Sequence, residues 1–355
     1  MLFSDANLLA SHAARRDNKR VKAEEERERR EEVERAQQNS MRRMTVSMRN
    51  PDKAALKFAR HGMLVIQCTE QEHFSVDVAS IASTCIELET RICARLRHLN
   101  VRFSGFSEMR KRDVAALLDD ERQHSFKFSE VSSRCLGRLD IKLPAEVVQQ
   151  HFSNQDAPWL SAVRAILGGE QDCHLAYCGL ISSFPGSFSQ PFHGDGPHLF
   201  GSSLQLPPHA VNVFVPLHAI TEELGPTEFF PGSHKIDTAT AIGRALATFS
   251  SLTQASSLKI LENCMQIGKV PVQPLLQPNR DILLYDYRTV HRGTSNKSLN
   301  TTRRMLYLLY TKSWFRDHIN FGESSIFDDG ASAALEAQRE VNVSSTGSCP
   351  GHEHL

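Results

Sequence analysis

Short apolar runs separated by turn residues fill the sequence from residue 173 onward, and this pattern limits the possible folds more than any other feature. Runs of this length, rich in Val, Ile, Leu, Phe and Tyr and bounded by Gly, Pro or Asp, predict strands. They lie within 173–184, 209–220, 227–231, 281–287 and 304–314. Several such strands in succession are typical of a β-sandwich or a β-barrel. This half of the chain therefore predicts a β core.

The residues before this core show the 3.6-residue period of amphipathic helices. Helices are expected at 54–60, 76–99, near 113–118, at 145–152 and at 159–167, and a short apolar run at 62–68 predicts one buried strand. Helices that precede a series of strands favour helices packed outside a β core. We therefore expect an α+β fold with a mainly β core, and the 40% hydrophobic content is sufficient to fill it.

The distribution of charge sets the first 50 residues apart. They hold 12 Lys and Arg against 9 Asp and Glu, a net charge of +3, with very few apolar side chains in 15–35. Pairs at i, i+4, such as Glu25 and Arg29, support a solvated helix. The expected organisation is a charged, mobile or partly helical arm at 1–50, a single domain at 51–327 with a helix-rich part at 51–170 and the β core at 171–327, and a mobile tail at 328–355.

Composition excludes several classes of protein. Lys plus Arg and Asp plus Glu are equal at 41 each, so the chain has no overall basic field for nucleic acid. No stretch of about 18 apolar residues is present, and the first residues lack a secretory-signal pattern. The eight cysteines contain no C-x-x-C pair, which favours reduced thiols. We expect a cytoplasmic protein with a small-molecule substrate, no nucleic acid, no membrane, and a protein partner for the arm as an open alternative.

Two histidines and one aspartate are the candidate metal ligands. His193 and Asp195 are two residues apart, so an extended chain directs both toward the same side. His291 ends an apolar run much later in the chain. Two His and one carboxylate form the facial triad of non-haem Fe(II) oxygenases, and we expect the ligating atoms within about 4 Å of one another. Taken alone, H-x-D patterns are common, and polar residues at strand ends remain the alternative.

An arginine at the start of the last expected strand is the candidate co-substrate anchor. Its guanidinium fork suits bidentate capture of a carboxylate, such as that of 2-oxoglutarate. Strand alternation places Arg303 and Tyr307 on one face and Arg304 on the other. Gln190, three residues before His193, contacts either a co-substrate or its own turn, and Asn212 is left equally open.

Several blocks in a fixed order resemble the phytanoyl-CoA dioxygenase family of Fe(II)/2-oxoglutarate oxygenases. They are PGSFSQPFHGDG at 185–196, VNVFVPLHAITEELGPTEFFPGSHK at 211–235 and YRTVHRGTSNKS at 287–298, followed by the arginine strand. The resemblance implies a double-stranded β-helix, also called a jelly roll, with helices packed outside. It also implies Fe(II), 2-oxoglutarate and O₂ as cofactor and co-substrates, with His193, Asp195 and His291 as iron ligands.

The family's arginine usually lies about eleven residues after the distal histidine and four before an aromatic residue. Here position 302 is Thr, so the loop is one residue longer, and we choose Arg303 over Arg304. The resemblance further implies oxidation, by preference hydroxylation, of a small or medium organic substrate with release of succinate and CO₂. Asp195 occupies the position where related halogenases have a small residue. The alternatives are a zinc or manganese enzyme and a non-catalytic binding or scaffold protein.

Overall fold

The computed structural model describes residues 3–47, 49–69, 75–104, 125–152, 157–199, 204–247, 264 and 267–344. The chain divides into two compact units, Met1–Arg43 and Met44–Leu355. The helix expected near 113–118 lies outside the described residues. None of the described helices is long and apolar enough to cross a membrane.

Nine strands form the main sheet of the second unit, in the order β1-β2-β9-β7-β11-β6-β5-β4-β3. Neighbouring strands are antiparallel except for β1 and β2, which are parallel. The strands are β1 (Thr45–Ser47), β2 (Met63–Gln67), β3 (Phe126–Lys127), β4 (Val131–Cys135), β5 (Arg138–Lys142), β6 (His174–Ser183), β7 (Ala210–Pro216), β9 (Asp281–Asp286) and β11 (Arg303–Thr311).

A small second sheet packs against one face of the main sheet, which is called the inner face below. It pairs β8 (Thr227–Phe229) with β10 (His291–Gly293), and single bridges join His193 to His291 and Phe229 to Val272. The Phe229 ring contacts the Tyr285 ring of β9, with centroids 5.1 Å apart, so side chains of the two sheets meet. Two antiparallel sheets facing each other with helices outside confirm the expected jelly-roll class.

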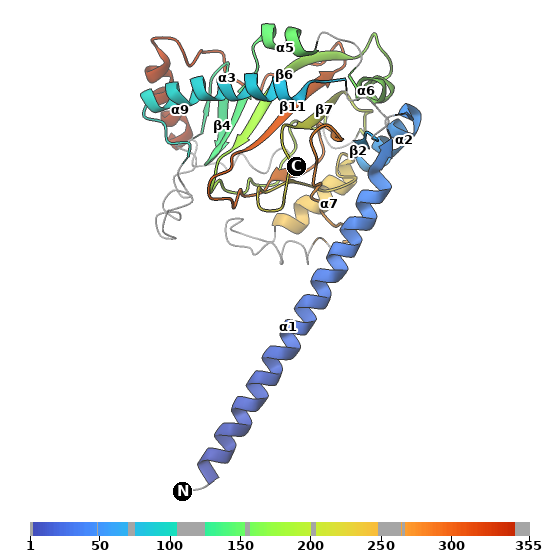
Figure 1. Ribbon diagram of the computed structural model, residues 1–355, viewed down its shortest axis with the longest axis vertical. Helices are drawn as coiled ribbons and strands as arrows, with labels where there is room; N and C mark the ends of the chain where they lie inside the picture. Colours follow the sequence, from blue (N-terminus) through green and yellow to red (C-terminus); the bar gives the residue numbers. More distant parts are fainter. Residues whose placement is uncertain are drawn as a thin grey trace. The chain divides into compact units, whose positions relative to one another are not determined.

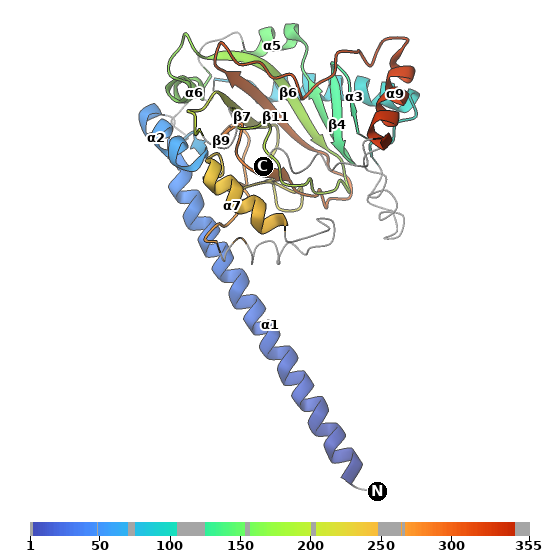
Figure 2. The same cartoon turned by 180° about the vertical axis from the view of Figure 1, so that it is seen from behind.

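In the described part of the chain, six helices accompany the sheets: α2 (Pro51–His61), α3 (Val78–His98), α5 (Ala145–Phe152), α6 (Leu160–Leu167), α7 (Ile236–Ala247) and α9 (Ala331–Ser344). Helix α3 lies across one face of the sheet, in front of β4, β6 and β11 in Figure 1 and behind them in Figure 2. Its Ile81 and Cys85 join the apolar cluster that contains Leu306 and Leu308 of β11. Because strand side chains alternate, the intervening residues of β11 face the second sheet.

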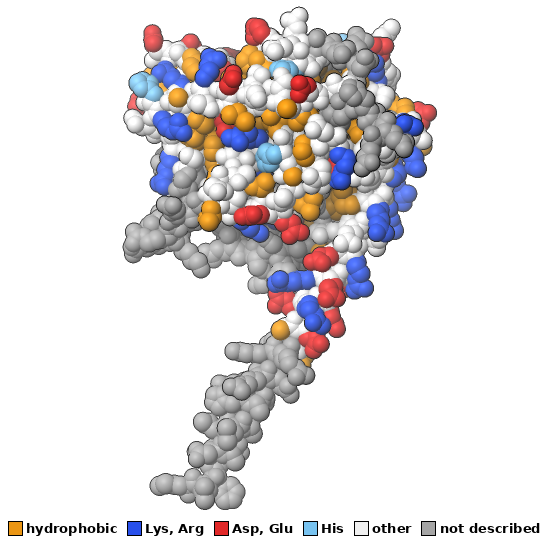
Figure 3. Space-filling model, in the orientation of Figure 1, with side chains coloured by type: hydrophobic (Ala, Val, Ile, Leu, Met, Phe, Trp, Pro, Cys, Tyr) orange, Lys and Arg blue, Asp and Glu red, His pale blue; other side chains and the backbone are white. Residues whose placement is uncertain are grey.

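The first unit is one long helix, α1 (Phe3–Met44). Lys, Arg, Asp and Glu side chains mix along its described part (Figure 3), and pairs such as Arg30 with Glu26 are exposed. Exposed pairs of this kind contribute about 0.3–0.5 kcal/mol each. The arm is shorter than expected, because Thr45–Ser47 forms β1 and the side chains of Met44 and Val46 are buried.

The expected mobile tail at 328–355 differs from the structure over 331–344, which forms α9. Ala331 and Leu335 are buried in the main apolar cluster. The Gln338 side chain accepts a hydrogen bond from the Lys127 amide and donates one to the Lys127 carbonyl, covering the edge strand β3. The sequence analysis also did not anticipate β3, β4, β5 or α7. The domain boundaries otherwise stay a prediction.

Candidate metal centre

Backbone pairing places His193 and His291 side by side. The His193 amide donates to the His291 carbonyl at 2.9 Å, and the His291 amide donates to the His193 carbonyl at 2.8 Å. Directly paired residues of antiparallel strands direct their side chains to the same face. The two imidazole rings accordingly lie with their centroids 4.6 Å apart.

Both imidazoles direct Nε2 toward the site because Nδ1 is engaged. His193 Nδ1 lies 2.8 Å from the Pro191 carbonyl oxygen, and His291 Nδ1 lies 2.9 Å from the Thr289 carbonyl oxygen. A carbonyl oxygen can only accept, so each Nδ1 donates its proton there, and in the neutral imidazole this leaves the lone pair of Nε2 to bind a metal. A hydrogen bond of this kind also fixes the orientation of the ring.

The two carboxylate oxygens of Asp195 have different surroundings. Oδ2 accepts hydrogen bonds from the Asn212 amide at 2.7 Å and the Tyr285 hydroxyl at 2.8 Å. Oδ1 faces His291 Nε2 at 3.6 Å. Burial, and then the charge of Asp195, raises the pKa of Tyr285 well above its ordinary value, so its hydroxyl remains a donor.

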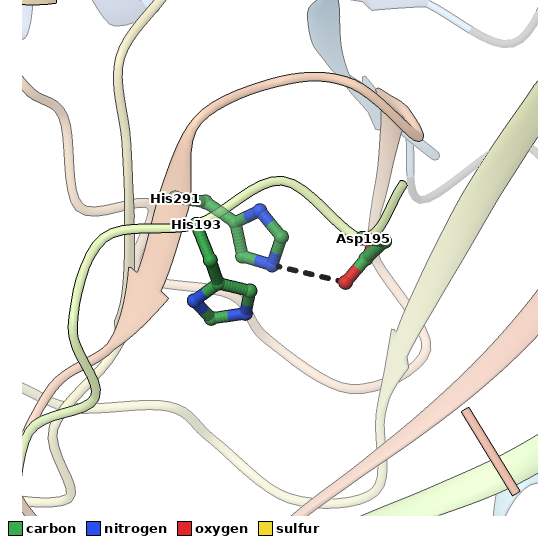
Figure 4. A group of neighbouring side chains, drawn as sticks. All are labelled: His193, Asp195 and His291. Atoms are coloured by element: carbon green, nitrogen blue, oxygen red, sulfur yellow. Dashed lines mark ion pairs between the residues drawn. The ribbon is translucent and has the colours of Figure 1, made fainter. Parts of the chain in front are cut away.

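The three side chains converge as the sequence predicts (Figure 4). One ligand atom from each lies within 4.8 Å of the others, somewhat wider than the expected separation. Within the part of the chain that the structure describes, no other group of three His, Cys, Asp or Glu side chains has this spacing. His198, His209, His218 and His234 are not part of this group.

A rigid turn delivers His291 from the end of β9. The Asp286 carboxylate binds the Arg288 side chain through two oxygens, at 2.8 and 2.7 Å, and both side chains are 1% exposed. The Thr289 hydroxyl donates to the Gly62 carbonyl at 2.9 Å. A buried, fully paired ion pair holds its turn in one conformation. Gly196 is needed opposite this turn, because a Cβ atom there would lie 2.0 Å from the Tyr287 ring.

Arg303 points to the inner face, and Arg304 points to the outer face. The Arg303 side chain is buried, and its Nη2 donates to the Ser183 hydroxyl at 2.8 Å. Its Nε and Nη1 have no hydrogen-bond partner among the described residues. Arg304 forms an ion pair with Glu89 of α3. The register of the last strand therefore agrees with the choice of Arg303 as the inward residue.

Arg138 is a second inward arginine that the sequence analysis did not single out. On β6, Ser183 pairs with Arg138 of β5 on one side and with Arg303 of β11 on the other. Arg138 is buried, and its Nη2 donates to the Phe188 and Thr294 carbonyls, but its Nε has no partner among the described residues. The alternation of Arg138 and Asp140 with Leu139 and other apolar residues was the available signal.

No described carboxylate forms an ion pair with either inner arginine. Burial, and then the charge of Arg138, lowers the pKa of Arg303 well below its usual value. A buried guanidinium normally has a carboxylate or phosphate partner, because an unpaired buried charge is costly. The unpartnered N–H groups of Arg138 and Arg303 therefore fit an anionic ligand with a carboxylate.

Gln190 ties the His193 segment to β10. Its side-chain oxygen accepts from the Gly293 backbone amide at 3.0 Å, and the Gln190 backbone amide donates to the Gly293 carbonyl at 2.8 Å. A Cβ atom at Gly293 would lie 2.2 Å from Arg138 Nη1, so a larger residue there would displace the Arg138 guanidinium. The expected contact of Gln190 with a co-substrate stays a prediction. Asn212, left open in the sequence, supports Asp195.

The sequence profile of the family described as "Phytanoyl-CoA dioxygenase (PhyH)" matches residues 58–305. The chain belongs to the phytanoyl-CoA dioxygenase family. The match includes His193, Asp195, His291 and Arg303 and confirms the resemblance on which the sequence analysis relied.

Solved structures of similar proteins include AviO1 from Streptomyces viridochromogenes Tue57, which is 15% identical, with a TM-score of 0.42 over 74% of this chain and 96% of that one. The epimerase SnoN in complex with Fe³⁺, alpha ketoglutarate and nogalamycin RO is 12% identical, with a TM-score of 0.44 over 79% and 97%. The non-heme alpha ketoglutarate dependent carbocyclase SnoK is 13% identical, with a TM-score of 0.39 over 73% and 83%. These scores lie below 0.5, so the family profile alone decides the family.

Proposed function

We propose that the protein is an Fe(II)- and 2-oxoglutarate-dependent dioxygenase that hydroxylates a small or medium organic substrate. The observation that carries this proposal is the combination of the His193, Asp195 and His291 group with unpartnered, buried arginines on the same inner face. The family profile supports the same reading. Bound iron would couple the decarboxylation of 2-oxoglutarate, to succinate and CO₂, to the oxidation of the substrate by O₂.

His193 Nε2, His291 Nε2 and Asp195 Oδ1 are the proposed iron-binding atoms. Imidazole and carboxylate ligands suit Fe(II), and three protein ligands leave positions for a co-substrate and O₂. The carbonyls of Pro191 and Thr289 hold the two rings through Nδ1. Asn212 and Tyr285 hold the second oxygen of the carboxylate.

Arg303 is the proposed anchor for the distal carboxylate of 2-oxoglutarate. Its Nε and Nη1 have no partner among the described residues, and either of them forms a two-donor fork for a carboxylate together with the second N–H of Nη2. Ser183 fixes the third nitrogen of the guanidinium. Arg138 pairs with Ser183 from the other side of β6 and so adds a second positive charge, which favours a doubly charged ligand over a neutral one.

The carboxylate of Asp195 favours hydroxylation over halogenation, because it fills the ligand position that a halide would need. Neither alternative from the sequence has a specific observation in its favour. A scaffold protein does not need three converging ligand atoms. A zinc or manganese hydrolase would have no use for the unpartnered guanidinium of Arg303.

Succinate release from the purified chain, with Fe(II), 2-oxoglutarate, O₂ and a panel of metabolites, tests the proposal. The expected result is succinate formation that increases with one class of substrate, whose product gains one oxygen atom from O₂. Asp195→Ala is the matched inactive variant, because it removes one ligand while His193 and His291 stay paired through their backbones. Equal succinate release by this variant, or none by the wild type with any panel member, would contradict the proposal.

A further inference from the structure

A buried carboxylate on the outer face of the sheet lies directly behind the proposed co-substrate anchor. Glu89 of α3 is 5% exposed. Its Oε1 accepts from Arg304 Nη2 at 2.6 Å, and its Oε2 accepts from Arg304 Nε at 3.0 Å and from the Ser182 hydroxyl. One side chain thus connects helix α3 to both β11 and β6.

Glu89 binds Arg304 and Ser182 on the outer face. Each of them is next in sequence to a residue of the inner-face contact between Arg303 and Ser183. Arg304 pairs with Ser182 across the two strands, and Arg303 pairs with Ser183 in the next step of the ladder. Outside, Glu89 joins Arg304 to Ser182; inside, Arg303 donates to Ser183. A movement of this part of the backbone would displace both pairs together.

The start of β11 is supported by a strand on one side only. Pairing with β7 begins at Met305, so Arg303 and Arg304 pair only with β6. The Arg304 amide instead donates to His218 Nε2 at 2.9 Å. A strand end with few backbone hydrogen bonds separates easily from its sheet. The contact with α3 should therefore have its largest effect on the backbone position of β11 at Arg303 and Arg304.

Stability alone does not account for this ion pair, in which the Glu89 side chain is 6% exposed and the Arg304 side chain 23% exposed. Most residues that α3 buries are apolar, among them Ile81, Leu88 and Ile92. Replacement of a buried ion pair by apolar residues of similar size is often neutral or stabilising. The carboxylate therefore has a more specific use than filling the core.

We infer that Glu89 is a positioning residue for 2-oxoglutarate: through Arg304 and Ser182 it fixes the strand ends so that Arg303 presents its guanidinium to the distal carboxylate. This inference rests on the proposed function. Glu89 itself contacts no co-substrate, since it lies on the opposite face of the sheet from Arg303. It acts through the backbone that Arg303 and Arg304 share.

The test compares two keto acids that differ at one end. 2-Oxopentanoate has the length of 2-oxoglutarate and can bind a metal in the same way, but it ends in a methyl group. Calorimetric titrations of the full chain loaded with Mn(II) give both dissociation constants. Glu89→Gln should weaken binding of 2-oxoglutarate by about tenfold, which is the size of effect usual for such indirect coupling. Binding of 2-oxopentanoate should stay within about twofold, because its terminal methyl group accepts no hydrogen bond from Arg303.

Glu87→Gln, an exposed position on the same helix, is the matched control and should bind both keto acids as the wild type does. The double variant Glu89→Leu with Arg304→Leu replaces the ion pair by apolar side chains and keeps the test available if Glu89→Gln does not fold. It should fold but still bind 2-oxoglutarate about tenfold more weakly.

Two results would overturn the inference: wild-type affinity for 2-oxoglutarate in a folded Glu89 variant, or equal weakening for both keto acids, which would indicate general loosening of the fold. A wild-type chain that binds 2-oxopentanoate but not 2-oxoglutarate, or neither, would contradict the proposed function itself and with it the role of Glu89.

Discussion

At the scale of single residues, two hydrogen bonds hold the Oδ2 atom of Asp195, and one of them can be removed with little change in the shape of the side chain that donates it. Tyr285→Phe deletes the hydroxyl that donates to Oδ2 at 2.8 Å. Loss of a hydrogen bond to a metal ligand typically weakens metal binding by about 10- to 100-fold. We predict a Fe(II) dissociation constant raised at least about tenfold, measured by anaerobic titration.

Tyr310→Phe is the control for this prediction. Tyr310 is also a buried tyrosine, but its hydroxyl accepts from the Trp159 indole on the helix-covered face of the sheet. Its loss should lower the free energy of unfolding by about 1 kcal/mol and leave iron binding unchanged. Equal iron affinity in Tyr285→Phe and the wild type would show that Asn212 alone orients the carboxylate.

Substitution of the two inner arginines should weaken 2-oxoglutarate binding to different degrees. Truncation of one partner in a desolvated, charge-assisted pair costs about 2–5 kcal/mol, so Arg303→Ala should raise the 2-oxoglutarate constant by about 30-fold or more. Arg138→Met should raise it less, because Arg138 also holds the Phe188 and Thr294 carbonyls. Iron affinity, titrated separately, should be little changed in Arg303→Ala. A large loss of iron binding there would place Arg303 nearer the metal ligands than proposed.

Stability should depend on pH through a buried histidine outside the metal centre. The His209 side chain is 2% exposed and lies against Phe315, with ring centroids 4.6 Å apart. Burial, and then the charge of Arg288, lowers its pKa from 6.5 to about 4. The unfolded chain therefore takes up the proton first, so this stability is complete above about pH 6.5 and decreases as the pH falls toward 4.

Once the pH is below both pKa values, protonation of His209 should have lowered the free energy of unfolding by roughly 3 kcal/mol. His209→Phe keeps an aromatic ring against Phe315 and cannot take up a proton. Denaturant unfolding between pH 7 and pH 4 should therefore show a smaller loss of stability for this variant than for the wild type. Parallel losses in the two proteins would mean that His209 is protonated in the folded state.

At the scale of elements, the boundary between the arm and the folded unit can be measured. The side chains described within 21–32 of α1 are exposed, whereas Met44 and Val46 are buried and Thr45–Ser47 pairs with β2. Removal of residues 1–32 should leave the melting temperature within about 2 °C of the full chain. Removal of residues 1–47 should lower it by more than about 5 °C, because β1 is lost. Equal melting temperatures for the two truncations would contradict this boundary.

Strands buried on both faces are easier to predict from this sequence than strands with one polar face. The strands β6, β7, β9 and β11 were predicted, because they read as long apolar runs; both faces of β7, β9 and β11 are buried, and β6 is buried mainly in its second half. The strands β4 and β5 were not, since VSSRC and RLDIK place polar residues on the face toward the site. The same inward polar residues include Arg138, so the missed strand and the missed site residue have one cause.

The convergence of the three candidate ligands was predicted better than the contacts around them. His193, Asp195 and His291 carry a recognisable spacing, and their convergence follows from a bridge between two chain segments far apart in sequence. The Glu89 contact with Arg304 joins positions 215 residues apart and leaves no local pattern. The helix α9 was also missed, because its two buried residues, Ala331 and Leu335, form too narrow an apolar stripe to indicate packing.

At the scale of the whole molecule, a formal net charge of zero conceals a local imbalance. On the inner face, Arg138 and Arg303 form no ion pair with a described carboxylate, since Asp195 accepts from Asn212 and Tyr285 and Asp140 accepts from Tyr307, and bound Fe(II) would add two further positive charges. A doubly charged co-substrate reduces this excess, and a neutral one does not. Binding of 2-oxoglutarate should therefore weaken with added salt less than surface binding does, since the charges involved are buried.

The most direct measurement of the central claim is an anaerobic titration of the wild type and of His193→Ala with Fe(II), followed by 2-oxoglutarate. The account predicts one Fe(II) per wild-type chain, then one 2-oxoglutarate that binds tightly only after the metal, and succinate once O₂ is admitted. His193→Ala should remain folded and lose the Fe(II) site. Iron binding that is unchanged in His193→Ala, or 2-oxoglutarate binding that does not depend on the metal, would contradict the account.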